Sequence, residues 1–352
     1  MSCAERVSIK DRRLFSYCPD LPMPFKMSGL LFVLCSLYFL PPILATEDVV
    51  SVDWLDKNKD SVKLLDATYQ PTFPNYKEFK EKYYGKFEEL MHLKSKHSEA
   101  YAKEHIPGAV FFDLDAAYYP SQYIRFDLYP PEEFEKYIRL LGINAGDHVV
   151  IYARAQYAGM LWAVRVWWTF KLYGHDNVSV LNGGLNAWKK AGKPVSDDVP
   201  VVEPGDWKAQ PIDKSILITF EELNEKRPGR PSIFDDLSKI NLLDGRPASE
   251  FFEGKPLQIP TKGVPGYHMK GSKNLPLDVL IGEDGLKSKA VIERALEKAG
   301  YNPNLPTVTM CNKGIQASVL ALIMKQVGVK ARVFNGSLTE VALRAPKLIS
   351  EK

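Results

Sequence analysis

The sequence has little cysteine and little net charge. Cysteine occurs four times in 352 residues, and Cys3, Cys18 and Cys35 lie in or before one apolar N-terminal stretch. The rest of the chain then has a single thiol, Cys311, and cannot form a disulfide within itself. The formal net charge is +3, with Lys and Arg interspersed among Asp and Glu, so no nucleic-acid partner is predicted. No spacing of His, Cys and acidic residues is typical of a metal site, and we predict neither a metal nor another cofactor.

The N-terminal apolar run covers residues 30–44, LLFVLCSLYFLPPIL. It is shorter than the roughly 20 residues of a membrane span, and Pro41 and Pro42 would interrupt a helix near its end. Residues 1–46 are therefore expected to be a removed signal, which would direct the protein to the secretory pathway or outside the cell. An uncleaved anchor, which is the one way in which the chain would meet a membrane, stays open. Two further alternatives stay open: the N-terminal segment is an artefact of start-site choice, or the protein is mitochondrial or cytoplasmic.

From about Val49 onward, short apolar strands alternate with amphipathic helices, which indicates an α/β fold with a largely parallel sheet. Parallel strands need crossover connections and are buried on both faces. The expected strands are 62–65, 110–112, 148–152 and 178–181, and the expected helices include 131–141 and 159–172.

The same order of strands, turns and helices occurs twice. The first half contains LLDA, HIPGAVFFDL, HVVIYA and VSVLNGG, and the second contains LLDG, HMKGSKNLPL, TVTMC and ARVFNGS. We therefore predict two homologous domains, 47–195 and 216–348, each with a mainly parallel sheet flanked by helices. Residues 196–215, which are rich in proline and lack apolar periodicity, are the expected linker.

Cys311 is expected between the carboxyl end of a strand, TVTM, and the amino end of a helix. Open α/β sheets place their ligands there, and backbone N–H groups and the helix dipole would stabilise an anionic sulfur. We therefore predict a lowered thiol pKa, with Lys313 adding a nearby cation. A small inert buried cysteine is the alternative, but Lys313 and Gly314 are not typical of a core. The first-half counterpart is Ala153, so only the second domain has the nucleophile.

The chain resembles the tandem-rhodanese family of thiosulfate and 3-mercaptopyruvate sulfurtransferases. The resemblance covers nearly everything after residue 47 and is carried by HIPGAVFFDLD, VRVWW with YGH, VSVLNGGLNAW, EDGLKS and CNKGI. It implies two similar α/β domains, called rhodanese-like, with a catalytic cysteine only in the second. It also implies that a six-residue loop cradles the transferred sulfur, and this loop maps to Cys311, Asn312, Lys313, Gly314, Ile315 and Gln316.

The mechanism implied by the resemblance is double displacement: the Cys311 thiolate takes sulfur from a small anionic donor, becomes a persulfide, and passes the sulfur to cyanide or a thiol. Thiosulfate enzymes resemble CRKGVT in the loop, and mercaptopyruvate enzymes resemble CGSGVT. This chain has CNKGIQ. Lys313 favours thiosulfate, Asn312 fits neither class, and 3-mercaptopyruvate stays the alternative donor.

Departures from the family pattern make the site atypical. The segment DGRPASEF keeps Asp244 and Arg246 of the family's DxRxxGR pattern, so Arg246 is a candidate substrate-binding residue. Glu250, however, replaces the second arginine and would repel an anionic donor. Leu338 and Val341 replace two tryptophans that help to wall the site. A catalytically weak persulfide carrier or a binding scaffold is therefore a second hypothesis of another class.

Other conspicuous residues have structural explanations. A cysteine phosphatase would need an arginine six residues after the cysteine, and Ala317 stands there. His105 and His268 each precede a glycine turn into a strand and are expected to fix it. We expect Asp66 and Asp244 to orient loops at strand ends. The aromatic run Trp162, Trp167 and Trp168 is expected to face the core or the other domain rather than to bind a ligand.

Overall fold

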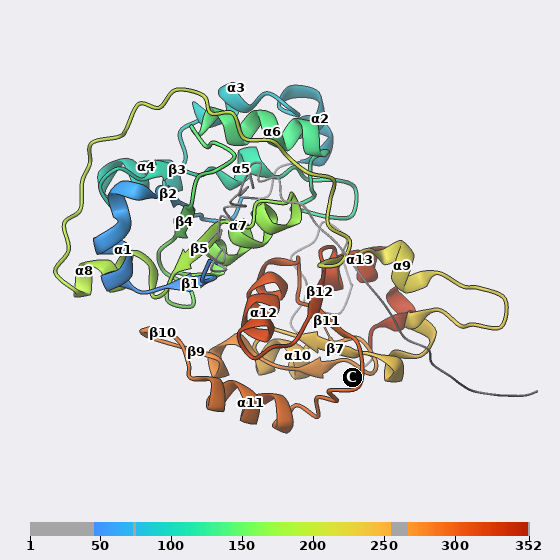
Figure 1. Ribbon diagram of the computed structural model, residues 1–352. Coiled ribbons are helices and arrows are strands. Elements are labelled where there is room, and N and C mark those ends of the chain that lie inside the picture. Colours follow the sequence, from blue (N-terminus) through green and yellow to red (C-terminus); the bar gives the residue numbers. More distant parts are fainter. Residues whose placement is uncertain (1–45, 73–74, 255–266, 351–352) are drawn as a thin grey trace, which may run out of the picture. The chain divides into compact units, whose positions relative to one another are not determined.

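The computed structural model describes residues 46–72, 75–254 and 267–350 (Figure 1). The predicted signal or anchor segment lies outside the described residues except for Thr46. None of the helices among the described residues has the length and apolar character needed to cross a membrane.

The first half forms a five-stranded sheet in the order β1-β5-β4-β2-β3, in which every pair of neighbours is parallel. Its elements, in chain order, are β1 Val49–Val50, α1 Val52–Asn58, β2 Lys63–Asp66, α2 Tyr76–Lys82, α3 Phe87–Met91, α4 Lys96–Lys103, β3 Val110–Phe111, α5 Leu114–Ala117, α6 Pro131–Leu140, β4 Val149–Tyr152, α7 Met160–Leu172, β5 Val178–Leu181 and α8 Gly184–Lys190.

The second half repeats this topology as β6-β12-β11-β7-β8, again all parallel, and adds a small antiparallel ribbon of β9 and β10. Its elements are β6 Leu217–Ile218, α9 Phe220–Asn224, β7 Asn241–Asp244, α10 Ala248–Glu253, β8 Lys273–Asn274, β9 Ile281–Gly282, β10 Gly285–Leu286, α11 Lys289–Lys298, β11 Thr307–Met310, α12 Ile315–Gln326, β12 Ala331–Phe334 and α13 Ser337–Arg344. The predicted α/β fold with two homologous halves is confirmed.

The expected strands and helices agree with the observed ones to within one residue at each end. Their apolar patterns have a local cause: β4, β5, β7 and β11 are buried along their whole length, because helices cover both faces of each parallel sheet. The strand that precedes Cys311, β11, lies between β7 and β12 in the middle of its sheet. The cysteine therefore follows a strand that is held on both sides.

The two halves meet where α7 packs against α12 (Figure 1). Trp168 on α7 is buried, and its Nε1 donates to the carbonyl of Ile216 at 3.4 Å. Trp167 and Trp168 also line a cavity together with Ala321 and Lys325 of α12. These two tryptophans thus face the other half, as expected for the aromatic run.

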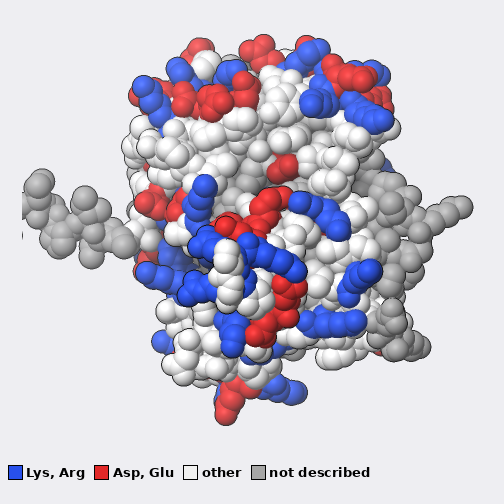
Figure 2. Space-filling view, turned by 90° about the vertical axis from the view of Figure 1, so that its right-hand side faces the viewer, with Lys and Arg blue, Asp and Glu red and all other residues white. Residues whose placement is uncertain are grey.

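Charged side chains of both signs are mixed over the face shown in Figure 2. Two surface ion pairs join the halves: Lys325 Nζ lies 2.7 Å from Asp48 Oδ1, and Lys190 Nζ lies 2.7 Å from Asp284 Oδ1. Exposed pairs of this kind contribute little, about 0–1 kcal/mol each. The interface therefore depends mainly on the buried α7–α12 contact, which includes Arg165 besides apolar side chains.

The linker predicted at 196–215 lies along the first half (Figure 1). The N–H of Gly205 donates to the carbonyl of Arg139 at 2.8 Å, and the N–H of Gln210 donates to Tyr173 at 2.9 Å. Trp207 is buried at 1 % exposure, and its Nε1 donates to Nδ1 of His175 at 3.0 Å. One buried indole therefore fixes a segment that has no helix or strand.

Replacing Trp207 with alanine should destabilise the protein by about 3–5 kcal/mol, because it removes a fully buried ring that packs edge-on against Phe134 and Phe170. Val201→Ala is the matched control in the same linker, since Val201 is 96 % exposed, and it should change stability by less than about 0.5 kcal/mol. Urea unfolding measures both changes. Equal effects of the two substitutions would show that the linker is not anchored through Trp207.

Candidate active site

Cys311 lies between β11 and α12 and is buried, at 1 % exposure. Its N–H donates to Ser337 Oγ at 3.1 Å, and its carbonyl accepts from the N–H of Leu338 at 3.0 Å. The N–H of Thr339 donates to the next carbonyl, that of Asn312, at 3.0 Å. The start of α13 therefore holds the backbone of the cysteine loop in place.

Two effects act in opposite directions on the pKa of the Cys311 thiol. Hydrogen bonds from the backbone N–H groups of Ala317, Lys313 and Gln316 lower its pKa, as the position at a helix N-terminus predicts. Burial has the larger effect and raises the pKa of the Cys311 thiol above its ordinary value. The predicted lowering is wrong, because the sequence shows the helix but not the loss of solvent around the sulfur.

Gly314 forms the turn of the loop and precedes the first residue of α12. It has φ +81°, a left-handed conformation that side chains disfavour. A Cβ atom at this position would also overlap the carbonyl oxygen of Asn335. The glycine is therefore required both by its backbone angle and by the close approach of the neighbouring loop.

Arg246 lies behind the loop, with 1 % exposure. Its Nη2 is 2.7 Å and its Nε 3.0 Å from the carboxylate of Asp244 at the end of β7. Its Nη1 approaches Asn312 Oδ1 at 3.5 Å, and Asn312 Nδ2 donates to Glu250 Oε2 at 2.9 Å. Arg246 is not among the described residues that line the cavity at Cys311. These contacts support a positioning role for Arg246, and its predicted contact with the substrate stays a prediction. Asp244 orients the strand end, as expected.

A cavity of about 540 Å³ opens onto Cys311. From the second half it is lined by the loop residues Asn312, Lys313, Ile315 and Gln316, together with Pro247 and Glu250. The structure thus brings together the predicted loop, with Gly314 serving through its backbone. Glu250 faces the same cavity, so its carboxylate lies where the sequence placed it.

The opposite wall of the cavity comes from the first half, through Phe126, Gln156, Tyr157, Leu161 and Trp162. Leu338 and Val341, by contrast, are fully buried in the core of the second half. Leu338 and Val341, which stand where the resemblance predicts tryptophans, are therefore not among the described residues that line the cavity. Trp162 is buried in the core, as expected, and also lines this cavity.

Tyr157 belongs to the first-half counterpart of the cysteine loop. That loop runs from Ala153 to Gly159, whereas the corresponding loop of the second half runs only from Cys311 to Gly314. Ala155, Tyr157 and Ala158 all have positive φ, which is uncommon away from glycine. The longer loop reaches across to the cavity, where Gln316 Nε2 donates to the hydroxyl of Tyr157 at 3.3 Å. The sequence analysis missed Tyr157, although the extra length of this loop was a usable signal.

Arg165 is the second residue that the sequence analysis missed. It lies on α7 with 0 % exposure, and its Nη2 donates to the carbonyl of Phe126 at 3.0 Å. Its Nη1 approaches the carbonyl of Gly314 in the cysteine loop at 3.5 Å. Burial lowers the pKa of Arg165. The signal was an arginine in the middle of an otherwise apolar helix, within VRVWW.

The two turn histidines have the structural role expected of them. His105 Nδ1 lies 2.9 Å from the carbonyl of Tyr101, and His268 Nδ1 lies 3.0 Å from that of Phe251. The ring of His268 also stacks on Phe251 at 4.1 Å. Asp66 accepts from the N–H of Thr68 at 2.8 Å and so orients its strand end, in line with expectation.

Comparison with known proteins agrees with this architecture. The model of the rhodanese-like domain matches residues 51–191 and 219–343. A Caenorhabditis elegans protein that carries the name of a thiosulfate sulfurtransferase is 40 % identical over 314 residues, or 86 % of this chain and 96 % of the relative. The human 3-mercaptopyruvate sulfurtransferase is 31 % identical over 247 residues, or 70 % of this chain and 79 % of the relative.

Among solved structures, SseA from Escherichia coli, a 3-mercaptopyruvate sulfotransferase, matches with a TM-score of 0.66. The match covers 83 % of this chain and 99 % of SseA at 22 % identity, and so describes the shared fold. A duplicated α/β domain with one cysteine loop defines the class, and the domain matches define the family: the chain belongs to the rhodanese family.

The raised pKa of Cys311 has a measurable consequence. The nucleophile is the thiolate, so its fraction keeps rising with pH until the pKa is reached. Alkylation of Cys311 by iodoacetamide, followed on its peptide by mass spectrometry, should therefore still accelerate between pH 7 and pH 9. The same cysteine in urea should level off near its ordinary pKa, about 8.5. A rate in the folded protein that is already constant at pH 7 would contradict the raised pKa.

Proposed function

We propose that the protein is a sulfurtransferase in which Cys311 carries sulfane sulfur as a persulfide. The observation that supports this most directly is the convergence of three backbone N–H groups on the sulfur, at the base of a cavity walled by both halves. Fixed donors of this kind stabilise negative charge on the thiolate and on the terminal sulfur of a persulfide. The names of the relatives support the same reaction class.

The proposed reaction has two displacements. The Cys311 thiolate attacks the outer sulfur of thiosulfate, a new sulfur–sulfur bond forms, and sulfite leaves with the electron pair of the old bond. A thiolate or cyanide then attacks the outer sulfur of the persulfide, and the Cys311 thiolate leaves. Each step exchanges one nucleophile for another and needs no external oxidant or reductant.

Thiosulfate is the proposed donor because of Lys313. This side chain lines the cavity. Burial, followed by the charge of Arg125, lowers the pKa of Lys313, and the Cys311 thiolate offsets part of this lowering. A charged amine beside the sulfur favours a dianionic donor and its sulfite leaving group. Ser318, the nearby serine on α12, donates its hydroxyl to the carbonyl of Ile315 at 2.8 Å, so it is engaged with the helix backbone. This arrangement favours thiosulfate over 3-mercaptopyruvate.

A weak persulfide carrier is the second candidate, and Glu250 is the observation that favours it. Its carboxylate lines the cavity, where it opposes an anionic donor. The hydrogen bond from Asn312 holds the carboxylate in place. A carrier would accept sulfur once and transfer it slowly.

The persulfide has a direct test. The purified protein incubated with thiosulfate should gain the mass of one sulfur atom on the peptide that contains Cys311, and cyanide should remove it as thiocyanate. Cys311→Ser is the control and should gain nothing. Many thiocyanates per protein indicate an enzyme, and a single one indicates the carrier. No gain from thiosulfate or 3-mercaptopyruvate would refute sulfur transfer, and the ratio of the two kcat/KM values decides the donor.

The repulsion by Glu250 predicts that Glu250→Gln raises kcat/KM for thiosulfate. Glutamine keeps the size of the side chain and removes the charge, and relief of a repulsion of about 1 kcal/mol is about fivefold in rate. Glu253→Gln is the matched control, since Glu253 lies on the same helix but is exposed and absent from the described lining of the cavity. Steady-state kinetics at low ionic strength measures both. An unchanged or lower kcat/KM in Glu250→Gln would show that the carboxylate does not oppose the donor.

A further inference from the structure

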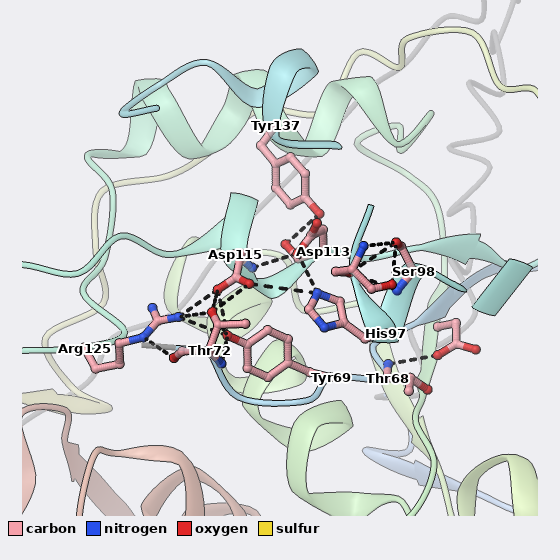
Figure 3. A network of polar contacts seen from close by, with 11 residues as sticks. Thr68, Tyr69, Thr72, His97, Ser98, Asp113, Asp115, Arg125 and Tyr137 are labelled. Atoms are coloured by element: carbon pink, nitrogen blue, oxygen red, sulfur yellow. Dashed lines mark hydrogen bonds and ion pairs between the residues drawn. The ribbon is translucent and has the colours of Figure 1, made fainter. Parts of the chain in front are cut away.

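A second cluster of polar residues lies in the first half (Figure 3). It consists of His97 on α4, Asp113, which caps the N-terminus of α5, and Asp115 in the first turn of α5. One ligand atom from each of the three lies within 4.8 Å of the other two. His97 and Asp113 are buried, at 2 % and 4 % exposure. This makes the cluster a potential ligand set rather than a solvated charged surface.

The His97 ring nitrogen Nε2 has no hydrogen-bond partner among the described residues, although it is fully enclosed. It points between the two carboxylates, 3.7 Å from Asp113 Oδ1 and 3.9 Å from Asp115 Oδ2 (Figure 3). These distances are too long for hydrogen bonds. Two ligands that share one ion at about 2.1 Å each are roughly 3.4 Å apart in a tetrahedral site. The two distances from His97 would therefore need to close by about half an ångström or less, and the two carboxylates, which lie within 4.8 Å of each other, by about 1.4 Å at most.

The remaining bonds of the carboxylates hold them in this arrangement. Asp113 Oδ1 accepts from the N–H of Asp115 at 2.8 Å. Asp115 Oδ1 accepts from Arg125 Nη2 and from the hydroxyl of Tyr69, both at 2.7 Å. The other oxygen of Asp115, Oδ2, lies toward His97 and accepts from the hydroxyl of Thr72 at 3.1 Å. Arg125 pairs with only one of the two carboxylates, that of Asp115.

We propose that His97, Asp113 and Asp115 bind a divalent transition-metal cation of the zinc class. One imidazole nitrogen and two carboxylate oxygens suit such an ion, and a water molecule completes the coordination. Asp115, whose side chain is 21 % exposed, provides the way in. A proton on Nε2 is the competing occupant of the same space.

The ion would join three segments that are distant in the chain. It would tie α4 to the turn between β3 and α5, and through Asp115 to Tyr69 after β2. The ring of Tyr69 packs edge-on against Trp162 at 4.9 Å, and Trp162 lines the cavity at Cys311. The metal is thus a structural element behind the first-half wall of the cavity. It takes no part in sulfur transfer, and the proposal is independent of that function.

Titration of the chelator-treated protein with zinc chloride tests the proposal, read by calorimetric stoichiometry and by the melting temperature. Cysteines also bind zinc, so the informative quantity is the difference between variants that share the same cysteines. The unsubstituted protein should bind one equivalent more than His97→Gln or Asp113→Asn, and zinc should raise its melting temperature by at least about 3 °C more. His92→Gln, which removes an exposed histidine just before the start of α4, should behave like the unsubstituted protein.

Two results would overturn the proposal. Equal zinc stoichiometry and equal stabilisation of the unsubstituted protein, His97→Gln and Asp113→Asn would show that the cluster binds no metal. A loss of melting temperature in His97→Gln without metal, with no added stabilisation of the unsubstituted protein by zinc, would show that His97 stabilises the fold without an ion. Far-ultraviolet circular dichroism of the metal-free variants identifies any that have not folded, and the other substitution then decides.

Discussion

The buried guanidinium of Arg165 is the constraint around which the two halves are arranged. A charge without solvent must be compensated by dipoles and aromatic faces. Arg165 obtains this compensation from the carbonyl of Phe126 and from the rings of Tyr118 and Trp168, at 4.8 Å and 4.7 Å. It also reaches the carbonyl of Gly314, in the other half. The position of the cysteine loop is therefore coupled to the first half by a group that cannot move without losing its partners.

Each half has a buried aspartate at a strand end, and the two halves balance its negative charge with different arginines. Each ends its second sheet strand, β2 or β7, in a buried aspartate, Asp66 or Asp244. In the second half the balancing cation is Arg246, two residues after Asp244. In the first half it is Arg154, in the loop after β4, whose Nη2 lies 3.1 Å from Asp66 Oδ2. Because Arg246 supplies the charge locally, the cysteine loop needs no cation for this purpose. Its own lysine, Lys313, is left to face the cavity.

The repeat, the sheet strands and the cysteine loop could be predicted because each depends on residues close together in the sequence. Strands such as β4 and β11 are continuous apolar runs, and the end of β11 places Cys311 by connectivity alone. The far wall of the cavity could not be found in this way, since Tyr157 and Gln316 are 159 residues apart. The pKa of Cys311 was predicted with the wrong sign for the same reason, because burial is a property of the assembled halves. Arg246 matched a motif, yet its depth behind the loop follows from packing.

The longer loop of the first half has a consequence for how such a site can change over time. The nucleophile and its three backbone donors belong to one copy of the domain, and the wall formed by Gln156, Tyr157 and Trp162 belongs to the other. Substitutions in this wall would alter the shape and polarity of the cavity while the cysteine loop stays intact. The cysteine loop and the wall that faces it can therefore change independently of each other, because they lie on separate copies of the repeated domain.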